Sequence, residues 1–419
     1  MRMTKYKLSE LVEVTRGASL SGQFYAEEGK LIRLTLGNFN MNGGGFKENT
    51  SKTDLYFTGT VRDEFILNEG DIITPLTEQS LGLLGTTARI PESGKYIQSQ
   101  DVALVRCKKG LLDPNFCYYL ISSSIVRQQL SAAAQQTKIR HTSPEKIKDC
   151  TVWVPDFEVQ KNIGRILTDI DNKIAINRQI NDNLEAMAKQ LYDYWFVQFD
   201  FPNEEGKPYK SSGGVMVWNE KLKRKIPQGW SNGVLSDVAN ITMGQSPDGS
   251  SYNEDGEGII FYQGSTDFGL RFPDIRQYTT SPSRYANKGD ILMSVRAPVG
   301  ALNIANNNCC IGRGLSALSS KIGSMTHLYY LLNDFRLKFE GMNSAGTTFG
   351  SITKDELFSL PVIIPTKSVI SEFEQVCEPI FDKQMIIGEE INALTKQRDE
   401  LLPLLMNGQA SVNYHLSDD

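Results

Sequence analysis

An internal duplication restricts the fold of this 419-residue chain more than any other feature of its sequence. Short blocks of the first half return in the second half in the same order, at an offset that falls steadily from 227 residues to 210. The matching blocks are LSELVEVTRG (8–17) and LSDVANITMG (235–244), GDIIT (70–74) and GDILM (289–293), IQSQDVAL (97–104) and IGRGLSAL (311–318), YYL (118–120) and YYL (329–331), and VWVP (152–155) and VIIP (362–365). A collinear series of this kind indicates one scaffold used twice.

The segments between these blocks differ in length and in content. Variable segments on a shared scaffold are free to carry different specificities, because connecting loops tolerate change better than the elements they join. The duplication therefore fits two related binding heads better than it fits one catalytic centre.

Each half has the sequence pattern of a mixed α/β domain. Short β-branched segments broken by glycine, such as LIRLTLGNF and GIIFYQGS, predict strands and tight turns. A helix is expected around 114–130 with a counterpart around 325–339, and a strand ending at Pro155 or Pro365 closes each globular part. The expected fold class is α+β, with two duplicated mixed α/β heads that are each followed by a long helix.

Apolar residues spaced three and four positions apart follow each closing proline, which is the pattern of coiled-coil helices. Burial under a single domain explains one such stripe equally well, but two equal helices at equivalent places favour packing against each other. We expect an antiparallel coiled coil with pseudo-twofold symmetry. Its expected contact residues are Ile163, Ile166, Ile170, Ile174, Ile180, Leu184 and Leu191 in the first helix, and Ile380, Ile387, Ile391, Leu394, Leu401 and Leu405 in the second.

Pro379 lies inside the second stripe and aligns with Asp169 of the first. Proline removes a hydrogen bond from a helix interior, whereas proline and aspartate both suit a first turn, so we expect a break near each position. The long helices would then span roughly 40 Å at about 1.5 Å per residue, which exceeds one turn of B-DNA.

These features divide the chain into five expected segments. They are a first head at 1–156, a long helix at 157–198, a linker at 199–229, a second head at 230–366 and a C-terminal long helix at 367–408. The linker is predicted from its Gly, Ser, Pro and Lys content. The aromatic run YDYWF at 192–196 either caps the coiled coil or docks a partner protein.

Composition excludes several classes of protein. The chain has no apolar run of the length that a membrane helix needs and none behind its basic start, so a cytoplasmic protein is expected. Six cysteines without a Cys-x-x-Cys pair and only three histidines argue against a zinc site or a disulfide framework. The net charge of −5 argues at first sight against a nucleic-acid partner, but basic residues gather locally at 138–148 and 271–313.

The sequence contains no convincing catalytic motif. It has no Pro-Pro for the base-binding motif of an amino-methyltransferase, and Gly244–Ser250 lacks the lysine of a phosphate-binding loop. Glu205-Gly206-Lys207 is spelled like part of a nuclease site but lies in the expected linker, and the histidines are too scattered for a Ser-His-Asp set. A chain without an active site or a metal site of its own is expected.

Several blocks together resemble the specificity subunit of type I restriction–modification systems. They are SPEKIKDCTVWVPDFEVQKNIGRILTDIDNKIAINRQINDNLEAMAKQLYDYWF (143–196), KRKIPQGW (223–230), DILMSVRAPVG (290–300), ITKDELFSLPVIIP (352–365) and LTKQRDELLPLLMNGQ (394–409). No single block is diagnostic, but their order and duplication cover nearly the whole chain.

The resemblance implies two target-recognition domains that each read one part of a bipartite site in double-stranded DNA, with the helices setting the gap. It also implies two modification subunits, which methylate adenine with S-adenosylmethionine, and restriction subunits, which translocate and cut DNA with ATP and Mg²⁺. The specificity subunit itself would bind none of these cofactors and would supply the address alone.

Residues that could read DNA are sought among Arg, Lys, Asn, Gln, Ser and Thr near glycines in the variable segments, because these side chains contact base edges and phosphates. Arg296, flanked by small residues and proline in SVRAPVG, is the foremost of them. The candidates are Arg33, Asn38, Asn40, Gln135, Gln136, Thr137, Lys138 and Arg140 in the first head, and Gln245, Ser246, Gln263, Arg271, Arg296, Arg313, Thr347 and Thr348 in the second.

Two other classes of function compete with a DNA-binding module. A self-contained nuclease or methylase would need the catalytic motifs that this sequence lacks. A structural adaptor would use its two heads to bind proteins, and salt-sensitive, sequence-selective DNA binding by the assembled complex separates it from the DNA-reading alternative.

Overall fold

The computed structural model describes residues 1–40, 44–78, 82–133, 140–344 and 350–411. The chain forms two compact units, one of Met1–Ala175 with Ala393–Asp419 and one of Ile176–Asn392. Each unit contains one head and part of each of two long helices.

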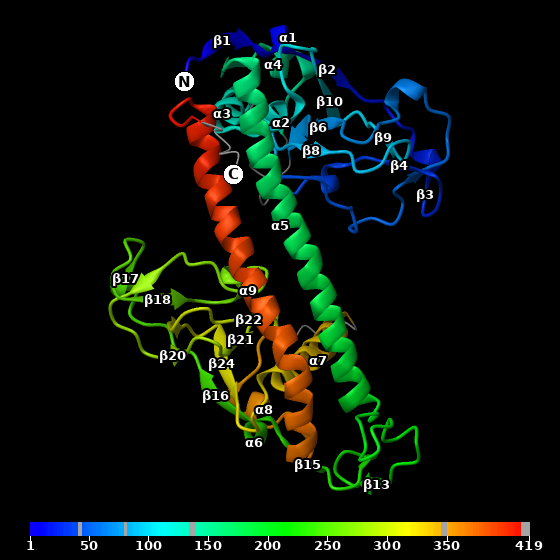
Figure 1. Ribbon diagram of the computed structural model, residues 1–419, viewed down its shortest axis with the longest axis vertical. Coiled ribbons are helices and arrows are strands. Elements are labelled where there is room, and N and C mark those ends of the chain that lie inside the picture. The colour runs from blue at the N-terminus through cyan, green and yellow to red at the C-terminus, as the bar shows by residue number, and fades with distance from the viewer. Residues whose placement is uncertain (41–43, 79–81, 134–139, 345–349, 412–419) are drawn as a thin grey trace, which may run out of the picture. The chain divides into compact units, whose positions relative to one another are not determined.

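The head of the first unit is built on two small sheets (Figure 1). One is antiparallel, in the order β2 (Val12–Arg16), β10 (Val102–Cys107), β6 (Ile72–Pro75) and β8 (Ala88–Arg89). The other has the order β3 (Tyr25–Ala26), β5 (Tyr56–Phe57), β4 (Leu31–Arg33) and β9 (Tyr96–Ile97). Two further pairs are β1 (Thr4–Lys7) with β12 (Thr151–Val154) and β7 (Thr77–Glu78) with β11 (Arg140–His141).

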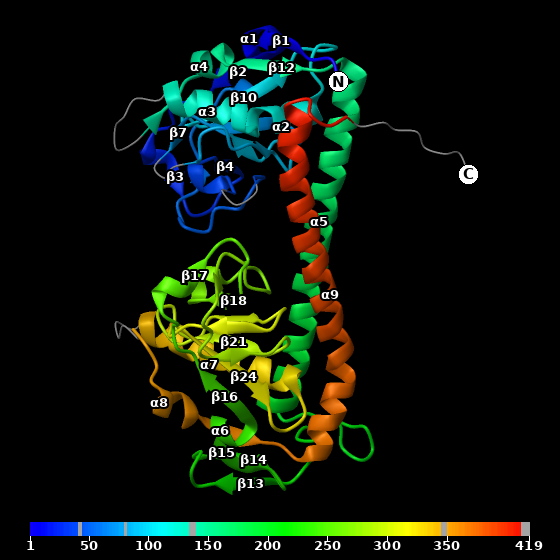
Figure 2. The same ribbon diagram turned by 90° about the vertical axis from the view of Figure 1, so that its left-hand side faces the viewer.

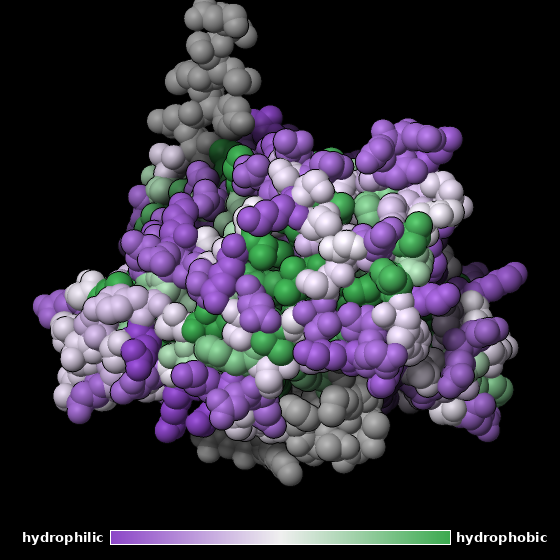
Figure 3. All heavy atoms as spheres, turned by 90° about the horizontal axis from the view of Figure 1, so that it is seen from below, coloured by the Kyte–Doolittle hydropathy of each residue, from purple (hydrophilic) through white to green (hydrophobic). Residues whose placement is uncertain are grey.

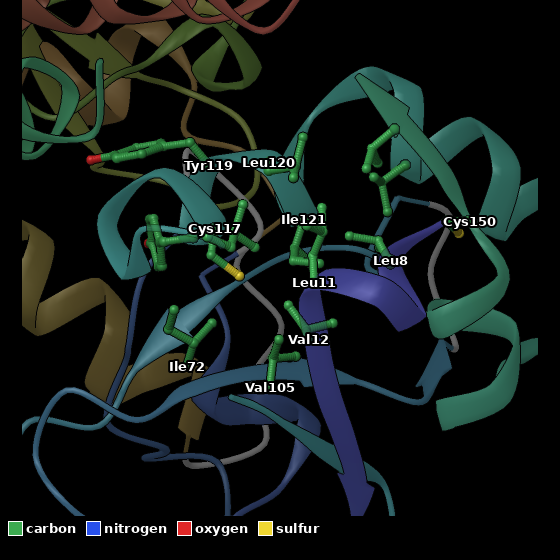
Figure 4. Close-up of a cluster of buried hydrophobic side chains, with 14 of the residues drawn as sticks. Leu8, Leu11, Val12, Ile72, Val105, Cys117, Tyr119, Leu120, Ile121 and Cys150 are labelled. Carbon is green, nitrogen blue, oxygen red and sulfur yellow. The ribbon is translucent and has the colours of Figure 1, made fainter. Parts of the chain in front are cut away.

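The core of this head lies between the first sheet and the helix α2 (Pro114–Ser122). Figure 4 shows Val12, Ile72 and Val105 of the sheet facing Cys117 and Ile121 of α2. The other side chains labelled in this cluster are Leu8 and Leu11 of α1 (Leu8–Leu11), Tyr119 and Leu120 of α2, and Cys150 after α4 (Pro144–Asp149). Six of these residues, Leu8, Leu11, Val12, Ile72, Tyr119 and Leu120, belong to the duplicated blocks, so the repeat marks core positions.

The helix expected at 114–130 is two helices, α2 and α3 (Ser124–Ala133). Ser123 has extended backbone angles and its hydroxyl donates to the carbonyl of Leu120, which ends α2. Its counterpart in the second head is a single helix, α7 (Met325–Ser344).

The second head repeats this arrangement. One sheet has the order β16 (Ala239–Met243), β24 (Leu315–Ser320), β21 (Ile291–Ser294) and β22 (Leu302–Ile304). The other has the order β17 (Tyr252–Asn253), β19 (Tyr278–Thr279), β18 (Ile259–Tyr262), β23 (Cys309–Ile311) and β20 (Tyr285–Ala286). The elements β15 (Ser231–Val234) with β25 (Pro361–Ile364), α6 (Leu235–Val238) and α8 (Lys354–Phe358) correspond to β1 with β12, α1 and α4. The predicted duplicated α/β architecture is confirmed.

The long helices are α5 (Phe157–Tyr192) and α9 (Lys367–Met406). Both are continuous, so the breaks predicted near Asp169 and Pro379 do not occur. At about 1.5 Å per residue they extend over roughly 54 and 60 Å, so the expected length of roughly 40 Å was too short. Pro379 and Gln375 are both exposed, so water can bond to the Gln375 carbonyl that proline leaves without a donor. None of the described helices is long and apolar enough to cross a membrane.

The two helices run antiparallel within each unit, as predicted, and Figure 2 shows them side by side. In the first unit Arg398 lies 3.0 Å from Asp171, measured between Nη1 and Oδ1. In the second unit Asn177 donates to Glu390 at 2.9 Å. Rising numbers on α5 therefore meet falling numbers on α9.

The segment expected to be a linker is folded. Its strands β13 (Met216–Asn219) and β14 (Arg224–Pro227) form a hairpin, and the ring of Phe201 stacks on Trp230 with centroids 5.0 Å apart. Trp195 and Phe196, in the π-helical turn Asp193–Val197, are buried in the same cluster as Trp230, so the aromatic run caps the end of α5. Figure 3 shows hydrophobic side chains gathered in the middle of the face seen from below.

Candidate nucleic-acid interface

Four loops of the second head meet at one edge of its sheet. In the antiparallel register Met243 lies opposite Ser316 and Ser294 opposite Leu315, so β16 and β21 end where β24 begins. The parallel pairing of Tyr262 with Ile311 brings the end of β18 to the same place. The residues that follow or precede these strand ends are Gln245, Ser246, Gln263, Arg296 and Arg313, which we call the head-2 edge.

Glycines allow these loops to approach so closely. A Cβ at Gly244 would lie 2.1 Å from the carbonyl oxygen of Gly312, and one at Gly314 would lie 2.8 Å from that of Gln263. No larger residue fits at either position without moving backbone. The close approach fixes the loops on one another, and the amide of Arg313 donates to the Ser246 hydroxyl at 3.3 Å.

Arg296 is held by its backbone, and its side chain makes no hydrogen bond to the described residues. The carbonyl of Arg296 accepts from the Ser294 hydroxyl at 2.6 Å, and the residue forms an isolated bridge with Ser351. Its side chain is exposed, as are those of Gln245, Gln263 and Arg313. The head-2 edge thus presents two guanidinium groups and two amides from four loops to solvent, and such groups read base edges in DNA.

The first head has an equivalent edge with different side chains. Arg16 at the end of β2 lies opposite Ala103, Pro75 at the end of β6 lies opposite Val102, and a Cβ at Gly17 would lie 2.2 Å from the Gln98 carbonyl oxygen. The exposed polar residues Arg16 and Gln100 flank this contact, and the sequence analysis missed both. The alignment of Gly17 with Gly244 was the signal that could have identified Arg16.

Arg140 belongs to the same region of the first head, because β11 pairs with β7 directly after β6. Its Nη1 lies 3.1 Å from the Ser131 hydroxyl and 3.7 Å from a carboxylate oxygen of buried Glu78. The guanidinium is partly exposed, so it can still contact an anion. Gln135, Gln136, Thr137, Lys138, Thr347 and Thr348 lie outside the described residues.

Arg33 and Asn38, both predicted to read DNA, are buried and bonded inside the first head. Arg33 donates to the Asp54 carbonyl at 3.0 Å and stacks on the Tyr25 ring. The Asn38 carboxamide accepts from the amide of Thr35 at 2.9 Å, which shapes the turn that follows β4. Neither side chain is placed to reach a base. The amide of Asn40 donates to the Gly45 carbonyl at 3.0 Å, and Asn40 is only partly exposed.

Arg271, another predicted DNA contact, is 9% exposed and faces the long helices rather than solvent. Its guanidinium donates to the Gln384 side chain of α9 at 3.0 Å and lies 3.4 Å from the Glu185 carboxylate of α5. The residue is therefore part of the junction between the second head and the helices.

The predicted coiled-coil residues lie at different depths. Buried are Ile163, Ile174, Ile387, Ile391 and Leu405; partly buried are Ile166, Ile170, Leu184, Leu191, Ile380, Leu394 and Leu401. Ile180 is 39% exposed, contrary to the prediction, because Asn177 and Asn181 occupy the buried positions on either side of it. The seam also buries Gln384 and Arg398, so polar contacts interrupt its apolar stripe.

The described residues contain no group of three or more His, Cys, Asp or Glu side chains that could hold a metal ion. The second unit has an apolar pocket of about 570 Å³, which is lined by residues such as Phe196, Leu331 and Val362. None of the residues that line this pocket belongs to the head-2 edge.

Comparison with known proteins gives one consistent family. A family model described as the type I restriction modification DNA specificity domain matches residues 2–186 and again residues 227–400. A relative from Methanocaldococcus jannaschii, provisionally named as the specificity subunit of the type I restriction enzyme MjaX, is 31% identical over 86% of this chain and 85% of its own. The HindI type I restriction enzyme specificity subunit of Haemophilus influenzae is 22% identical over 75% of this chain and 81% of its own.

A solved structure has the same fold. The crystal structure of the type I restriction–modification system S subunit from M. genitalium superposes with a TM-score of 0.62 at 17% identity, covering 97% of this chain and 96% of its own. The family model matches once over each half of the duplication, and the relatives align along most of the chain. The chain therefore belongs to the DNA specificity subunits of type I restriction–modification systems.

Proposed function

We propose that this subunit reads a bipartite site in double-stranded DNA, one half with each head, and that partner subunits carry out the chemistry. The observation that carries the proposal is the head-2 edge, where Gln245, Gln263, Arg296 and Arg313 come together from separate sequence blocks and remain exposed. Arginine pairs with guanine and glutamine with adenine in the major groove, so these four side chains suit base recognition.

The proposed partners are two modification subunits, which methylate adenine with S-adenosylmethionine, and restriction subunits, which use ATP and Mg²⁺. The chain itself would act without a bound cofactor, in the cytoplasm. With a net charge of −5, it would leave much of the phosphate contact to these partners.

The experiment that tests the proposal is methylation mapping by single-molecule sequencing of genomic DNA, with the subunit co-expressed with its methyltransferase partner and with the partner alone. Methyl-adenine at one split motif, found only when both proteins are present, is the expected result. Methylation of the same sites without this subunit, or no split motif although the proteins co-purify, would favour the adaptor alternative.

Alanine at Arg296 or Arg313 should weaken recognition of one half-site only. Loss of a bidentate contact to a base costs about 1–3 kcal/mol of discrimination. We expect a roughly 5- to 150-fold drop in kcat/KM for methylation of the original motif, with relaxed preference at one base pair of the half-site read by the second head. Arg276→Ala is the matched control, because Arg276 is exposed in the same head but outside the edge. An equal loss in the control would show that general charge, and not the edge, is responsible.

The length of the helix pair should set the gap in the motif. Seven residues inserted both after Ala175 and after Asn392, at the boundaries of the two units, preserve the antiparallel contacts within each unit. Two added turns correspond to about 10 Å, so the split motif should keep its bases and gain about 3 base pairs between them. Methylome sequencing of the double insertion provides the measurement. An unchanged gap in an active complex would contradict the spacer role.

A further inference from the structure

The second head holds the long helices through two adjacent residues of a variable segment, Arg271 and Phe272. They lie between β18 and β19, in the segment that opens with Gln263 of the head-2 edge. The amide of Ile304 donates to the Arg271 carbonyl at 3.0 Å, and the amide of Gly269 donates to the Phe272 carbonyl at 3.1 Å. The first bond fixes the Arg271 backbone to β22, and the second closes a turn that holds Phe272 within the segment.

Phe272 packs into a notch on α9 that a glycine creates. A Cβ at Gly388 would lie 2.8 Å from the Cε2 atom of the Phe272 ring, so alanine cannot be accommodated unless the ring moves. Glycine in a helix interior costs about 1 kcal/mol relative to alanine. The sequence therefore keeps a destabilising residue in α9 where the ring of the head requires the space.

Arg271 reaches both helices at once. Besides its bond to Gln384 of α9 and its contact with Glu185 of α5, its guanidinium lies 4.9 Å from the centroid of the Phe381 ring and 5.5 Å from that of Tyr329 in α7. Gln384 also donates to Glu185 at 2.9 Å, which closes the polar group. A charge that is 9% exposed is retained only where its partners are well placed.

The first unit has no copy of this arrangement among its described residues. The repeat of α9 in α5 places Ile174 of the first unit at the position of Gln384, so an apolar side chain stands where Arg271 finds its amide partner. The buried arginine at the helix pair of the first unit, Arg398, belongs to α9 instead of to the head, and its partner Asp171 accepts from Tyr119 of α2 at 2.6 Å. The contact through Arg271 and Phe272 is thus particular to the second head.

We propose that Arg271 and Phe272 are positioning residues for the second half-site. They lock the segment that carries Gln263 to helices α5 and α9 and touch no DNA themselves. This inference rests on the proposed bipartite recognition. If it holds, a recognition segment in the second head works only together with a helix surface that has the notch at Gly388.

The test measures discrimination rather than activity. Complexes of the methyltransferase partner with Gly388→Ala, Phe272→Ala or the double variant are assayed on duplexes that carry the native motif, one changed base in either half, or a gap altered by one base pair. For each single variant we expect about a tenfold loss of discrimination against the altered gap and against changes in the second half-site. Discrimination at the first half-site should stay unchanged.

Internal rescue separates positioning from general damage. In the Phe272→Ala background the notch is empty, so adding Gly388→Ala should cause little further loss. Asn392→Ala, at an exposed position of the same helix, is the matched control and should behave like the wild type. Helix content and co-purification with the methyltransferase confirm that each variant is folded and assembled.

The outcomes distinguish this inference from the function on which it rests. If the wild-type complex shows no split motif, the proposed function fails. If the wild type shows a split motif but the variants discriminate as it does, or lose methylation equally on all duplexes, the positioning role of Arg271 and Phe272 is wrong.

Discussion

The second unit should lose on the order of 4 kcal/mol of stability as the pH falls from about 6.5 to about 3, and His327→Phe should remove most of this loss. His327 is 2% exposed in α7, its ring centroid lies 4.5 Å from that of Phe196, and its Nδ1 has no hydrogen-bond partner among the described residues. Burial in this apolar environment lowers the pKa of His327 to about 3.

The sign of the effect follows from which state binds the proton. In the unfolded chain His327 takes up a proton below its ordinary pKa of 6.5, whereas in the folded chain it stays neutral until about pH 3. The unfolded state therefore gains protons first, and stability falls as the pH drops through this window. Well above its ordinary pKa of 6.5 the group is uncharged in both states and contributes nothing to this dependence.

The duplication supplies the conservative substitution for this experiment. The YYL blocks align His327 with Phe116, each the third residue of its helix, and Phe116 is fully buried in the first head. Urea unfolding of the whole chain at several pH values, followed by hydrogen exchange in α7, measures the effect. His141→Gln, at an exposed position of the first head, is the control. The same pH dependence in His327→Phe and the wild type would exclude His327 as the source.

Replacement of Arg398 by Met should destabilise the first unit by about 3 kcal/mol, because the carboxylates of Asp171 and Asp399 lose the buried positive charge with which they pair. Arg398 is 8% exposed, and its guanidinium lies 3.0 Å from Asp171 and 2.7 Å from Asp399. The Tyr119 hydroxyl donates to the same Asp171 carboxylate, so the arginine joins both helices to the head. Burial, followed by the charge of Asp171, raises the pKa of Tyr119, which therefore remains a donor at neutral pH.

A double-mutant cycle isolates this interaction from the loss of packing. Asp171→Asn alone should also destabilise the first unit, because it removes a charge that is paired with buried Arg398, and the double variant should cost less than the two single changes added together. Hydrogen exchange of the amides in α2 reports the stability of the first unit specifically. Strict additivity of the two changes would mean that the ion pair does not couple the helices to the head.

The sequence predicted the scaffold well, because the duplicated blocks coincide with core elements. The GDIIT and GDILM blocks place Ile72 and Ile291 in central strands, and the apolar stripes after Pro155 and Pro365 became continuous helices. Repetition and periodicity reveal burial in such segments because each apolar residue recurs in a fixed phase. The break expected at Pro379 did not occur. The presence of a proline does not reveal whether the carbonyl four residues earlier is exposed to water, and here Gln375 is exposed.

The candidate site was predicted only in part, because polarity does not reveal whether a side chain is exposed. Arg33 and Asn38 are polar residues near glycine, as the edge residues are, yet their partners are backbone carbonyls 21 and 9 residues further along the chain. The partners of Arg271 lie 86 and 113 residues away, in helices whose pairing had to be known first. In contrast, Gln245 directly follows a duplicated block and Arg313 lies inside one, which places them together once the sheet order is known.

The first unit is assembled from both ends of the chain, with the second unit inserted between its parts. During synthesis on a ribosome, the residues up to Ala175 therefore emerge long before Ala393–Met406, the half-helix that packs against them. All residues of the second unit are synthesised before the first unit is complete, so the second unit can fold first although its head is translated second. A nascent chain that stalls before Arg398 would leave Asp171 and the apolar side of α5 uncovered, which makes it a natural substrate for chaperones and proteases.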